Sequence, residues 1–365
     1  MIRTEAAVMV AANQPLVVTE IQVDEPEPHE VRVAVSHVGL CHSDLHYLAG
    51  TVPIEAPVVL GHEVAGVVES VGAAVSTVTP GDRVVGVLTP SCGRCTNCEA
   101  GRSTQCQRTE EIRRRPRPAF QDAHGAPIGR LGDLGAFSRH ILLRENALAK
   151  LPDDVDTRVG CLLSCCVITG VGAVIRGAEV RAGSTVAVIG CGGVGSAIIQ
   201  GARLAGASAI VAIDLDEARL DAARGYGATH VVNGATGDVA AAVREQLGDG
   251  VDYSFEAVGS ARTAETALAV LRPTGTACLV GIAPSGTHLS LPAEDFFFQE
   301  KRLIGSYMGS GQAREDIRQL AELYRQRRLL LDEMVTKVIG FHDINAGFDA
   351  MSSGDVTRIV VDLQS

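Results

Sequence analysis

Four closely spaced cysteines are the residues best suited to chemistry in this sequence. Cys92, Cys95, Cys98 and Cys106 follow the pattern C-x2-C-x2-C-x7-C. Four thiolates at such short spacing can surround one tetrahedral Zn²⁺ and leave it no open position, which is typical of a structural site. Free or redox-active thiols are the alternative, but four cysteines rarely cluster in this way without a metal. A zinc ribbon that binds nucleic acid is disfavoured because the net charge is −11.

A second set of metal-ligand types is dispersed along the chain. It comprises Cys41, the adjacent His62 and Glu63, and Cys165. Two thiolates and one imidazole make a zinc site with three protein ligands and an open fourth position, which is an arrangement of catalytic zinc. Taken one at a time, each of these residues could equally be an ordinary buried residue whose hydrogen bonds are made within the core. The other cysteines have no such context and are expected to be small packing residues: Cys161, Cys166, Cys191 and Cys278.

A glycine-rich turn is the third candidate. The sequence GCGGVG at residues 190–195 follows a strand-like run, Thr185–Ile189, and opens a helix-like stretch at 194–204. Glycines let the backbone approach a pyrophosphate, and the helix N-terminus offers unpaired N–H groups. Asp214, at the end of the next apolar run, would accept hydrogen bonds from ribose hydroxyls and repel a 2′-phosphate, so we expect NAD rather than NADP. A helix N-cap is the alternative role for Asp214.

The elements that must position these groups follow two different sequence patterns. Up to about residue 150, short β-prone runs at 31–35, 66–71, 83–88 and 137–143 are separated by Gly and Pro, which favours antiparallel units or a partly open barrel. From about residue 184, strand-like runs alternate with helical stretches, which predicts a mostly parallel, doubly wound sheet; these runs are 185–189, 209–213, 251–255 and 276–280. The C-terminal part, with a charged helix at 313–327 and a strand at 358–363, again has the mixed pattern of the N-terminal part. We therefore expect the α/β unit to be inserted within the first domain.

Length and composition favour a compact protein of two domains. The chain has 365 residues, of which 46% are hydrophobic and 21% charged, so it can bury two cores. The acidic balance and the absence of Trp argue against nucleic acid as a partner. The sequence has no export signal and no apolar run of roughly 20 residues, so we expect a cytoplasmic protein with no membrane partner. The only basic run is interpreted as a solvated loop: Arg113, Arg114, Arg115 and Arg117.

Together these features resemble the zinc-containing medium-chain dehydrogenase/reductase family, alcohol dehydrogenase type. The segment Gly61-His62-Glu63-x2-Gly66-x5-Gly72-x2-Val75 matches the family's zinc signature, and the other motifs follow in the family's order. The resemblance implies a GroES-like, mostly β catalytic domain at residues 1–166 and 308–365. It implies a Rossmann NAD-binding domain, with a doubly wound parallel sheet, at 167–307. It further implies two Zn²⁺ per subunit, one catalytic and one structural, and a homodimer that pairs near residues 303–308.

The resemblance also implies roles for individual positions. Cys41, His62 and Cys165 correspond to the catalytic zinc ligands, with Glu63 beside the metal, and the four-cysteine loop corresponds to the structural site. Ser43 and His46 fall at the family's proton relay, and Thr169 falls where a side chain packs on the nicotinamide. Arg358 lies where an arginine reaches the pyrophosphate. The remaining implied cofactor contacts are His42, Gly190, Gly192, Gly193, Val194, Gly195, Asp214, Arg219 and Val258.

Two positions depart from the family pattern. His42 stands where many members have an arginine on the pyrophosphate, and a neutral imidazole holds a diphosphate less strongly than guanidinium does. We therefore predict weaker NADH binding as the pH rises through the titration of His42; a loop residue that points to solvent is the alternative. Leu88 stands where a substrate-lining aromatic is common, while Phe137 occupies another such place. The implied pocket is apolar and open on one side, and suits medium-chain or aromatic primary alcohols.

The predicted function is reversible hydride transfer between such an alcohol and NAD, with zinc acting as a Lewis acid. A thiol-adduct formaldehyde dehydrogenase, dependent on glutathione or mycothiol, is a rival from the same superfamily. Its adduct carboxylates would need cationic partners, for which the arginine run is the only candidate. A non-catalytic zinc- and nucleotide-binding sensor is the rival from another class.

Overall fold

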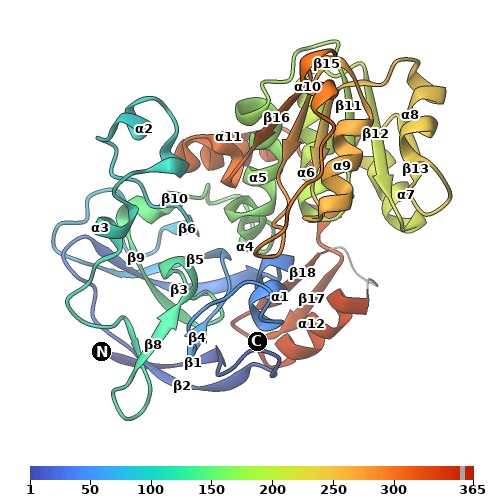
Figure 1. Cartoon of the computed structure of the whole chain (residues 1–365). Helices are drawn as coiled ribbons and strands as arrows, with labels where there is room; N and C mark the ends of the chain where they lie inside the picture. Colours follow the sequence, from blue (N-terminus) through green and yellow to red (C-terminus); the bar gives the residue numbers. More distant parts are fainter. Residues whose placement is uncertain (354–357) are drawn as a thin grey trace. The chain divides into compact units, whose positions relative to one another are not determined.

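Two compact units make up the chain in the computed structural model, which describes residues 1–353 and 358–365 (Figure 1). Unit 1 consists of Met1–Cys165 and Gln312–Ser365, and unit 2 of Cys166–Gly311. The sequence predicts domain boundaries at 166/167 and 307/308, and the structure divides the chain after Cys165 and after Gly311.

Unit 1 combines a small closed barrel with a larger sheet. The barrel order is β1 (Ile2–Met9), β2 (Val17–Val23), β7 (Phe120–Gln121), β8 (Pro127–Arg130) and β4 (Val58–Val59). The sheet order is β10 (Leu148–Lys150), β6 (Arg83–Gly86), β5 (Glu63–Val71), β3 (Glu30–Gly39), β18 (Ile359–Asp362) and β17 (Lys337–Gly340), with β9 (His140–Arg144) also paired to β3. In β3, Val31, Val33 and Val35 are buried while Arg32 and Ala34 are only partly so, which is the period of two expected of a strand.

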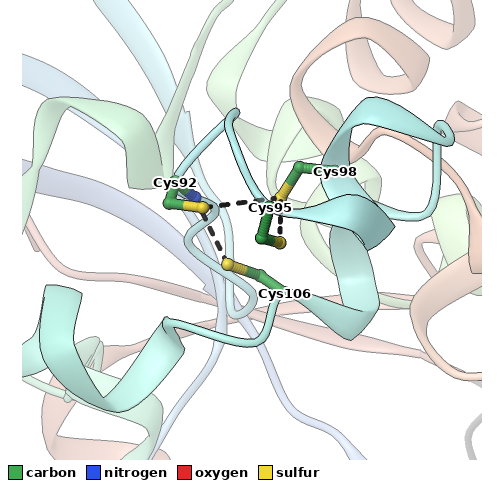
Figure 2. Close-up of side chains that lie close together, drawn as sticks. All are labelled: Cys92, Cys95, Cys98 and Cys106. Atoms are coloured by element: carbon green, nitrogen blue, oxygen red, sulfur yellow. Dashed lines mark hydrogen bonds between the residues drawn. The ribbon is translucent and has the colours of Figure 1, made fainter.

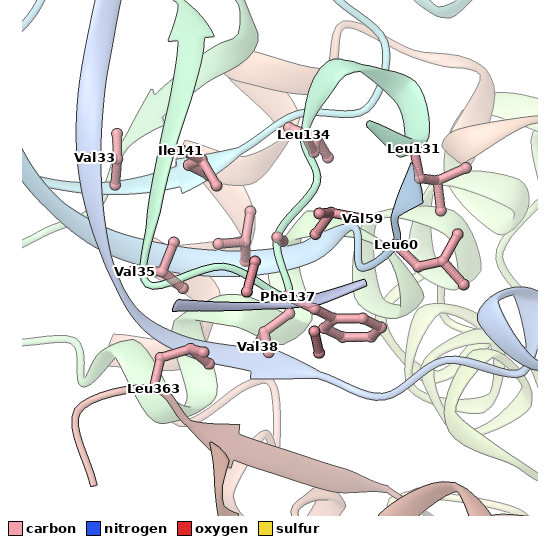
Figure 3. Close-up of a cluster of buried hydrophobic side chains, with 14 of the residues drawn as sticks. Val33, Val35, Val38, Val59, Leu60, Leu131, Leu134, Phe137, Ile141 and Leu363 are labelled. Atoms are coloured by element: carbon pink, nitrogen blue, oxygen red, sulfur yellow. The ribbon is translucent and has the colours of Figure 1, made fainter. Parts of the chain in front are cut away.

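Short helices connect the strands of unit 1, and an apolar core lies among them. The helices are α1 (His42–Leu48), α2 (Thr96–Glu99), α3 (Thr109–Arg113), α4 (Thr157–Gly160), η4 (Cys161–Ser164), α11 (Ala313–Arg325) and α12 (Ile344–Ser353). The core contains β-branched residues of the sheet and Phe137 (Figure 3). The Phe137 ring packs edge-on against Phe348, with 5.8 Å between ring centroids. Gly61, at φ +87°, passes so close that a Cβ there would lie 2.6 Å from the Phe137 ring.

Unit 2 is a doubly wound α/β domain. Its six strands are all parallel, in the order β13 (His230–Asn233), β12 (Ala209–Asp214), β11 (Thr185–Ile189), β14 (Val251–Glu256), β15 (Leu271–Leu279) and β16 (Arg302–Gly305). The helices are α5 (Cys166–Gly172), α6 (Gly193–Leu204), α7 (Glu217–Tyr226), α8 (Val239–Leu247), α9 (Ala261–Ala269) and α10 (Ala293–Phe297). The strand order reverses between β11 and β14, where such folds bind nucleotides. The chain thus has the predicted fold class, a GroES-like unit with a Rossmann unit.

The bounds of several predicted strands differ from the structure; for example, β15 begins at Leu271 rather than at residue 276, and β6 ends at Gly86 rather than at residue 88. The strand predicted from residue 137 begins only at His140, because the N–H of Phe137 is donated to Leu60 O in an irregular segment. The strand predicted at 303–308 ends at Gly305. Met308, Gly309 and Ser310 all have positive φ instead, and this turn packs so closely on α5 that a Cβ on Gly309 would lie 2.3 Å from Ile168 O.

Within the described residues, no single helix is both long and apolar enough to cross a membrane. One bent pair of helices, at 157–164 and 166–177, passes the length and composition test only when its two parts are joined, and most of its residues are buried.

Candidate active site

The four cysteines of the lobe converge as their spacing predicts (Figure 2). Their sulfur atoms all lie within 4.8 Å of one another, with 3.4 Å between Cys95 and Cys98 and 4.0 Å between Cys92 and Cys98. A tetrahedral zinc with Zn–S bonds of about 2.3 Å places its sulfurs ~3.8 Å apart. The geometry of the lobe therefore fits a closed tetrathiolate zinc site.

Backbone donors point at the thiols of this lobe. Hydrogen bonds from the backbone N–H groups of Cys98 and Gln107 lower the pKa of Cys95 to about 6. Burial, together with the hydrogen bond to Cys95, raises the pKa of Cys98 to about 12. Neighbouring thiolates repel each other, so all four ionise together only around a cation. The donor set thus matches a metal rather than four independent thiols.

The dispersed ligands also converge, all within unit 1. One donor atom each from Cys41, His62, Glu63 and Cys165 lies within 4.8 Å of the others, and all four residues are buried. The antiparallel register of β3 and β5 explains part of this convergence, because Gly39 pairs with Glu63. A Cβ on Gly39 would lie 2.3 Å from Glu63 Oε2, so only glycine leaves room for that carboxylate. Cys165 reaches the cluster from the end of η4.

The electrostatics of this cluster favour a positive charge at its centre. A hydrogen bond from Cys165, helped by the charge of His62, holds the pKa of Cys41 well below its ordinary value despite burial. Burial alone would lower the pKa of His62, but the negative charges of Asp44 and Cys41 outweigh it and leave that pKa well above its ordinary value. Two thiols, an imidazole and a carboxylate in such a field fit a divalent cation.

Asp44 is a functional candidate that sequence reasoning missed. Its carboxylate is completely buried, and Oδ1 accepts from Gly61 N at 3.1 Å and lies 3.3 Å from His62 Nδ1. A carboxylate on one imidazole nitrogen fixes the tautomer and leaves the other nitrogen, Nε2, for a metal. The only signal in the sequence was its place three residues after Cys41, on the same short helix. A second missed residue, Ser164, donates to the carbonyl oxygen of His62.

Glu63 and Arg358 form a buried ion pair beside the cluster. Arg358 Nη1 lies 3.0 Å from Glu63 Oε1 and 2.8 Å from Leu40 O. Burial raises the pKa of Glu63 to about 8, even though Arg358 opposes that shift. Glu63 Oε2 is buried and has no hydrogen-bond partner among the described residues. Arg358 thus has an established partner in unit 1, and its contact with a pyrophosphate stays a prediction.

Helix α1 carries the predicted relay residues one turn apart. Ser43 Oγ lies 3.5 Å from Cys41 Sγ, and His46 Nδ1 lies 3.1 Å from Thr51 Oγ1. Positions three apart share one face of a helix, so Ser43 and His46 lie in line. His42 is the first residue of α1 and is exposed. Its contact with a cofactor stays a prediction.

The glycine turn has the form that a dinucleotide needs. Gly190 has a φ of +90°, and a Cβ on Gly195 would lie 1.7 Å from Gly190 O, so strand and helix touch only through glycines. Around Gly192 a Cβ would meet nothing within 4 Å, which leaves the backbone open to a ligand. Helix α6 has no side-chain cap at Gly192, whereas α7, α8 and α9 are capped by Asp216, Asp238 and Ser260. The first N–H groups of α6, at Gly193, Val194 and Gly195, suit a phosphate.

The other predicted cofactor residues of unit 2 lie near this turn or on α5. Asp214 Oδ2 accepts from Cys191 N at 2.7 Å, while Oδ1 accepts from the two N–H groups that follow it. Asp214 is therefore no helix cap; that role belongs to Asp216, whose carboxylate is also the one that Arg219 faces at 3.9 Å. Val258 is half exposed and lies against Gly190. On α5, Thr169 is buried, with Oγ1 3.7 Å from Met308 Sδ.

The two predicted pocket residues differ in accessibility. Leu88 is partly buried and touches the edge of the unit 1 core, where a Cβ on Gly132 would clash with it. Phe137 lies wholly inside that core, as Figure 3 shows. Its role in a substrate pocket therefore rests on its sequence position alone.

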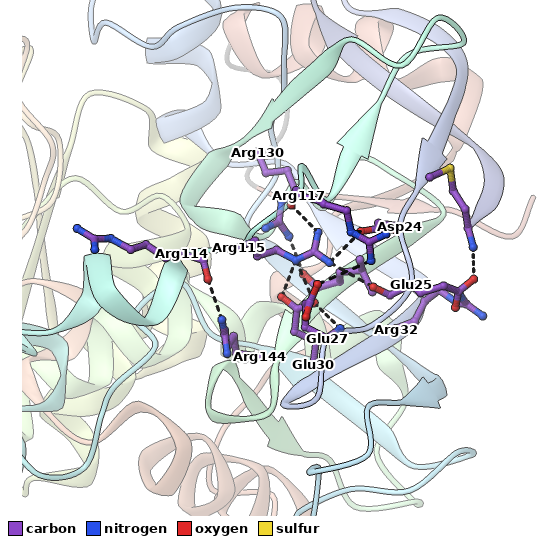
Figure 4. A network of polar contacts seen from close by, with 12 residues as sticks. Asp24, Glu25, Glu27, Glu30, Arg32, Arg114, Arg115, Arg117, Arg130 and Arg144 are labelled. Atoms are coloured by element: carbon purple, nitrogen blue, oxygen red, sulfur yellow. Dashed lines mark hydrogen bonds and ion pairs between the residues drawn. The ribbon is translucent and has the colours of Figure 1, made fainter.

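The arginine run is only partly the solvated loop that its charge predicted, because Arg114 and Arg117 are exposed. The side chain of Arg115 is only 6% exposed and pairs with two buried carboxylates, Glu30 at 2.9 Å and Asp24 at 3.4 Å (Figure 4). Arg117 also faces Asp24, and Arg113 donates to Leu88 O and pairs with Asp133. Arg113 and Arg115 are therefore paired within unit 1, and Arg115 ties the loop to the β2–β3 connection.

Comparisons with known proteins agree with this architecture. A family model described as an alcohol dehydrogenase GroES-like domain matches residues 27–153, and one described as a zinc-binding dehydrogenase matches residues 193–326. An alcohol dehydrogenase zinc-binding domain protein from Burkholderia ambifaria is 34% identical over 99% of both chains, with a TM-score of 0.94. Benzyl alcohol dehydrogenase from Acinetobacter calcoaceticus is 30% identical over 100% of both chains, with a TM-score of 0.92. A zinc-binding dehydrogenase from Sinorhizobium meliloti, solved with NADP bound, is 26% identical over 100% of both chains, with a TM-score of 0.83.

The GroES-like unit, the Rossmann unit and the two cysteine sites define a zinc-dependent dehydrogenase. The chain belongs to the zinc-containing medium-chain dehydrogenase family, alcohol dehydrogenase type, and is an oxidoreductase of that kind.

Proposed function

We propose that this protein oxidises primary alcohols, aromatic or of medium chain length, with NAD as the acceptor, and reduces the corresponding aldehydes in reverse. The observation that carries this proposal is that Cys41, His62 and Cys165 converge in a site distinct from the four-cysteine lobe. Two cysteines and one histidine are a ligand set found in catalytic zinc sites. A chain with only a structural zinc would not need the second cluster.

In this proposal, Cys41, His62 and Cys165 hold a catalytic zinc, and Cys92, Cys95, Cys98 and Cys106 hold a structural one. When bound, the catalytic zinc supplies Lewis acidity that lowers the pKa of a substrate hydroxyl. Asp44, at His62 Nδ1, orients the imidazole so that Nε2 is left for the metal. Glu63, with Arg358 on one carboxylate oxygen and no hydrogen-bond partner on the other, would lie beside such a metal and help to balance its charge.

Proton transfer would run along helix α1. Ser43 Oγ is next to Cys41 Sγ, so it is suited to accept the hydroxyl proton of a substrate held at that cluster. His46 lies one turn further along the helix, and an imidazole can both accept and donate a proton, which suits passing it to solvent. Such a relay moves the proton away from the buried cluster without burying a charge.

Unit 2 would bind the dinucleotide, whose nicotinamide ring takes the hydride. The open backbone at Gly192 and the uncapped start of α6 support a pyrophosphate at this turn. The fixed carboxylate of Asp214 supports NAD, because it repels a 2′-phosphate. The relative from Sinorhizobium meliloti binds NADP, so the preference is a measurable property of this chain. Thr169 on α5 is proposed to pack on the nicotinamide, and Arg219, Val258, His42 and Arg358 to contact the remaining cofactor.

Substrate size is proposed from Leu88 and from the benzyl alcohol dehydrogenase relative. An aliphatic side chain in place of an aromatic one leaves more room for a phenyl or hexyl group. The thiol-adduct formaldehyde dehydrogenase is less well supported, since two of the four arginines of the run, Arg113 and Arg115, are paired with carboxylates of unit 1. Thiolate ligands must also stay reduced, which supports a cytoplasmic location.

A substrate screen tests this function. Reduction of NAD and of NADP is followed at the nicotinamide absorbance band with ethanol, hexanol and benzyl alcohol, and with formaldehyde in the presence and absence of glutathione or mycothiol. We expect benzyl alcohol and hexanol with NAD to give the highest kcat/KM. Turnover only of formaldehyde with an added thiol would favour the rival dehydrogenase, and NAD binding without any turnover would favour a sensor.

We also propose a homodimer through the edge of the unit 2 sheet. Strand β16 is an edge strand, and the adjacent Phe297 and Phe298 are 77% and 80% exposed, which is unusual for aromatic side chains. Lys301, buried against Leu268 O and Asp295, anchors the segment that carries them. Replacing both Phe297 and Phe298 by Asp should give a monomer in light scattering, whereas an unchanged mass would contradict this interface.

A further inference from the structure

Ser164 precedes the ligand Cys165 and is almost completely buried, at 1% exposure. Its hydroxyl Oγ lies 2.7 Å from His62 O and 2.8 Å from Gly86 O. A serine hydroxyl has one proton to donate, so the two carbonyl oxygens share it. One side chain therefore links the segment of one zinc ligand to the backbone of another.

The two carbonyl groups lie where a strand ladder opens. Strands β5 and β6 pair from Val67 and Arg83 to Ala65 and Val85, and no pair continues the ladder beyond that point. Gly86 follows Val85 directly, and His62 lies three residues before Ala65, just ahead of the start of β5. The Ser164 hydroxyl thus bridges the two strands beyond their last backbone pair, at the place where β5 begins.

His62 is held from two directions as a result. Asp44 binds its imidazole Nδ1 and the N–H of Gly61, and Ser164 binds its carbonyl oxygen. The second contact also fixes Cys165, the next residue in the chain. Cys41 and Cys165 are 124 positions apart in the sequence, so their sulfurs meet only if such links set the spacing of the segments.

We propose that Ser164 is a positioning residue for the catalytic metal: its hydroxyl sets the distance between Cys165 and His62 and thereby the affinity of the three-ligand site. This inference rests on the proposed function, because it requires that the site binds zinc. The hydroxyl does not touch the metal or the substrate. Its role is to hold two ligands in the geometry that the metal needs.

A matched control exists in the same unit. Ser138 is also fully buried, and its hydroxyl also donates to two carbonyl oxygens, His140 O at 2.9 Å and Glu5 O at 3.5 Å. It neighbours none of the proposed ligands in the sequence. Ser138→Ala therefore removes the same kind of buried hydrogen bond without touching the metal site.

The experiment compares the metal sites of wild type, Ser164→Ala and Ser138→Ala. Zinc content is measured first, then zinc affinity by competition with a chromophoric chelator, and finally the absorption spectrum of the protein with Co²⁺ in the three-ligand site. We expect Ser164→Ala to weaken zinc binding at this site about 10- to 100-fold and to alter the Co²⁺ bands, as loss of an outer partner does. Ser138→Ala should retain both, and Ser164→Thr, which keeps the hydroxyl, should recover most of the affinity.

Wild-type affinity and an unchanged Co²⁺ spectrum in Ser164→Ala would overturn the inference, as would an equal loss in Ser138→Ala. A wild type that binds only one zinc per subunit would instead contradict the proposed function. Should Ser164→Ala be recovered unfolded, zinc is titrated during refolding. Recovery at about tenfold higher zinc than wild type supports the positioning role, and no recovery at any zinc concentration contradicts it.

Discussion

The two cysteine sites of unit 1 gather their candidate metal ligands in opposite ways. The lobe gathers its four ligands from one stretch of 15 residues, between Cys92 and Cys106. Its supports are equally local, such as the bonds from Asn97 to Gln105 O and from Thr109 to Cys106 O. The three-ligand site draws Cys41, His62 and Cys165 from segments far apart in the chain, and its supports are tertiary.

In the proposed function, this difference separates the structural site from the catalytic one. A local loop closes completely around its metal, and four thiolates leave no position for a substrate. A site assembled from a strand end, a helix start and a 3₁₀ turn leaves one position open, but it depends on side chains such as Asp44 and Ser164. The lobe should therefore govern stability and the dispersed site should govern turnover, and four experiments test this division.

Removal of one dispersed ligand should have the largest effect. We expect Cys165→Ala to lose one zinc and to lower kcat/KM by ~10³-fold or more, because several kcal/mol of charge stabilisation are lost with the metal. The neighbouring Cys166 is also buried and is no ligand in this account, so Cys166→Ala should keep zinc content and most activity. Equal losses of zinc and of kcat/KM in the two variants would contradict the assignment of turnover to the dispersed site.

Removal of one lobe ligand should act on stability instead. Cys98→Ala opens the tetrathiolate site, and we expect the midpoint of thermal unfolding to fall on the order of 10 °C, since a structural zinc contributes several kcal/mol. Below that temperature kcat/KM should fall less than about tenfold, because the three-ligand site is intact. Scanning calorimetry and turnover at low temperature check this. An unchanged midpoint with activity abolished would contradict it.

The support of His62 should have a smaller effect than the ligands themselves. Asp44→Asn keeps an acceptor for Gly61 N but removes the charge beside the imidazole, so zinc affinity at this site should fall about 10- to 100-fold. Chelator competition measures the loss, and the lobe serves as the internal control because its affinity should not change. Unaltered affinity at both sites would show that Asp44 is not a support.

The smallest expected effect is on the pH dependence of unit 1. Burial lowers the pKa of His37, and Arg158 adds to this shift, while Asp362 and Asp156 only partly oppose it. The folded state keeps His37 neutral, so below an ordinary pKa of about 6.5 the unfolded state binds more protons. Stability should be level above about pH 6.5 and fall as the pH drops further, by at most ~1.4 kcal/mol per unit.

His37→Gln tests that pH dependence, because the amide can still bond to Thr157, which lies 2.9 Å from His37 Nδ1. Denaturant unfolding of this variant should show a shallower loss of stability at acid pH than wild type. A profile as steep as that of the wild type would assign the loss to other groups.

Local patterns were readable from the sequence. The run Thr185–Ile189 is a strand with the predicted bounds, because both faces of a central parallel strand are buried and its sequence is continuously apolar. The lobe was readable for the same reason, since its ligand spacing is set within one loop. The family resemblance extended this to the paired units, which the structural relatives confirm.

Tertiary roles were not readable. Asp44 and Ser164 are common polar residues whose importance lies in partners 17 to 18 and 78 to 102 positions away. Arg115 belongs to a run of charge that is typical of a solvated loop, yet its carboxylate partners lie 85 and 91 positions earlier and bury it. Only the fold brings such partners together, so no spacing within the run could reveal them.

A zinc titration of the wild-type protein distinguishes the roles proposed for the two sites. Metal is removed under reducing conditions and returned in steps, while thermal stability and benzyl alcohol oxidation with NAD are followed in parallel. We expect two phases: the first equivalent of zinc restores stability through the four-cysteine lobe, and the second restores turnover through Cys41, His62 and Cys165. Stability and turnover that rise together and are complete at one equivalent would contradict it.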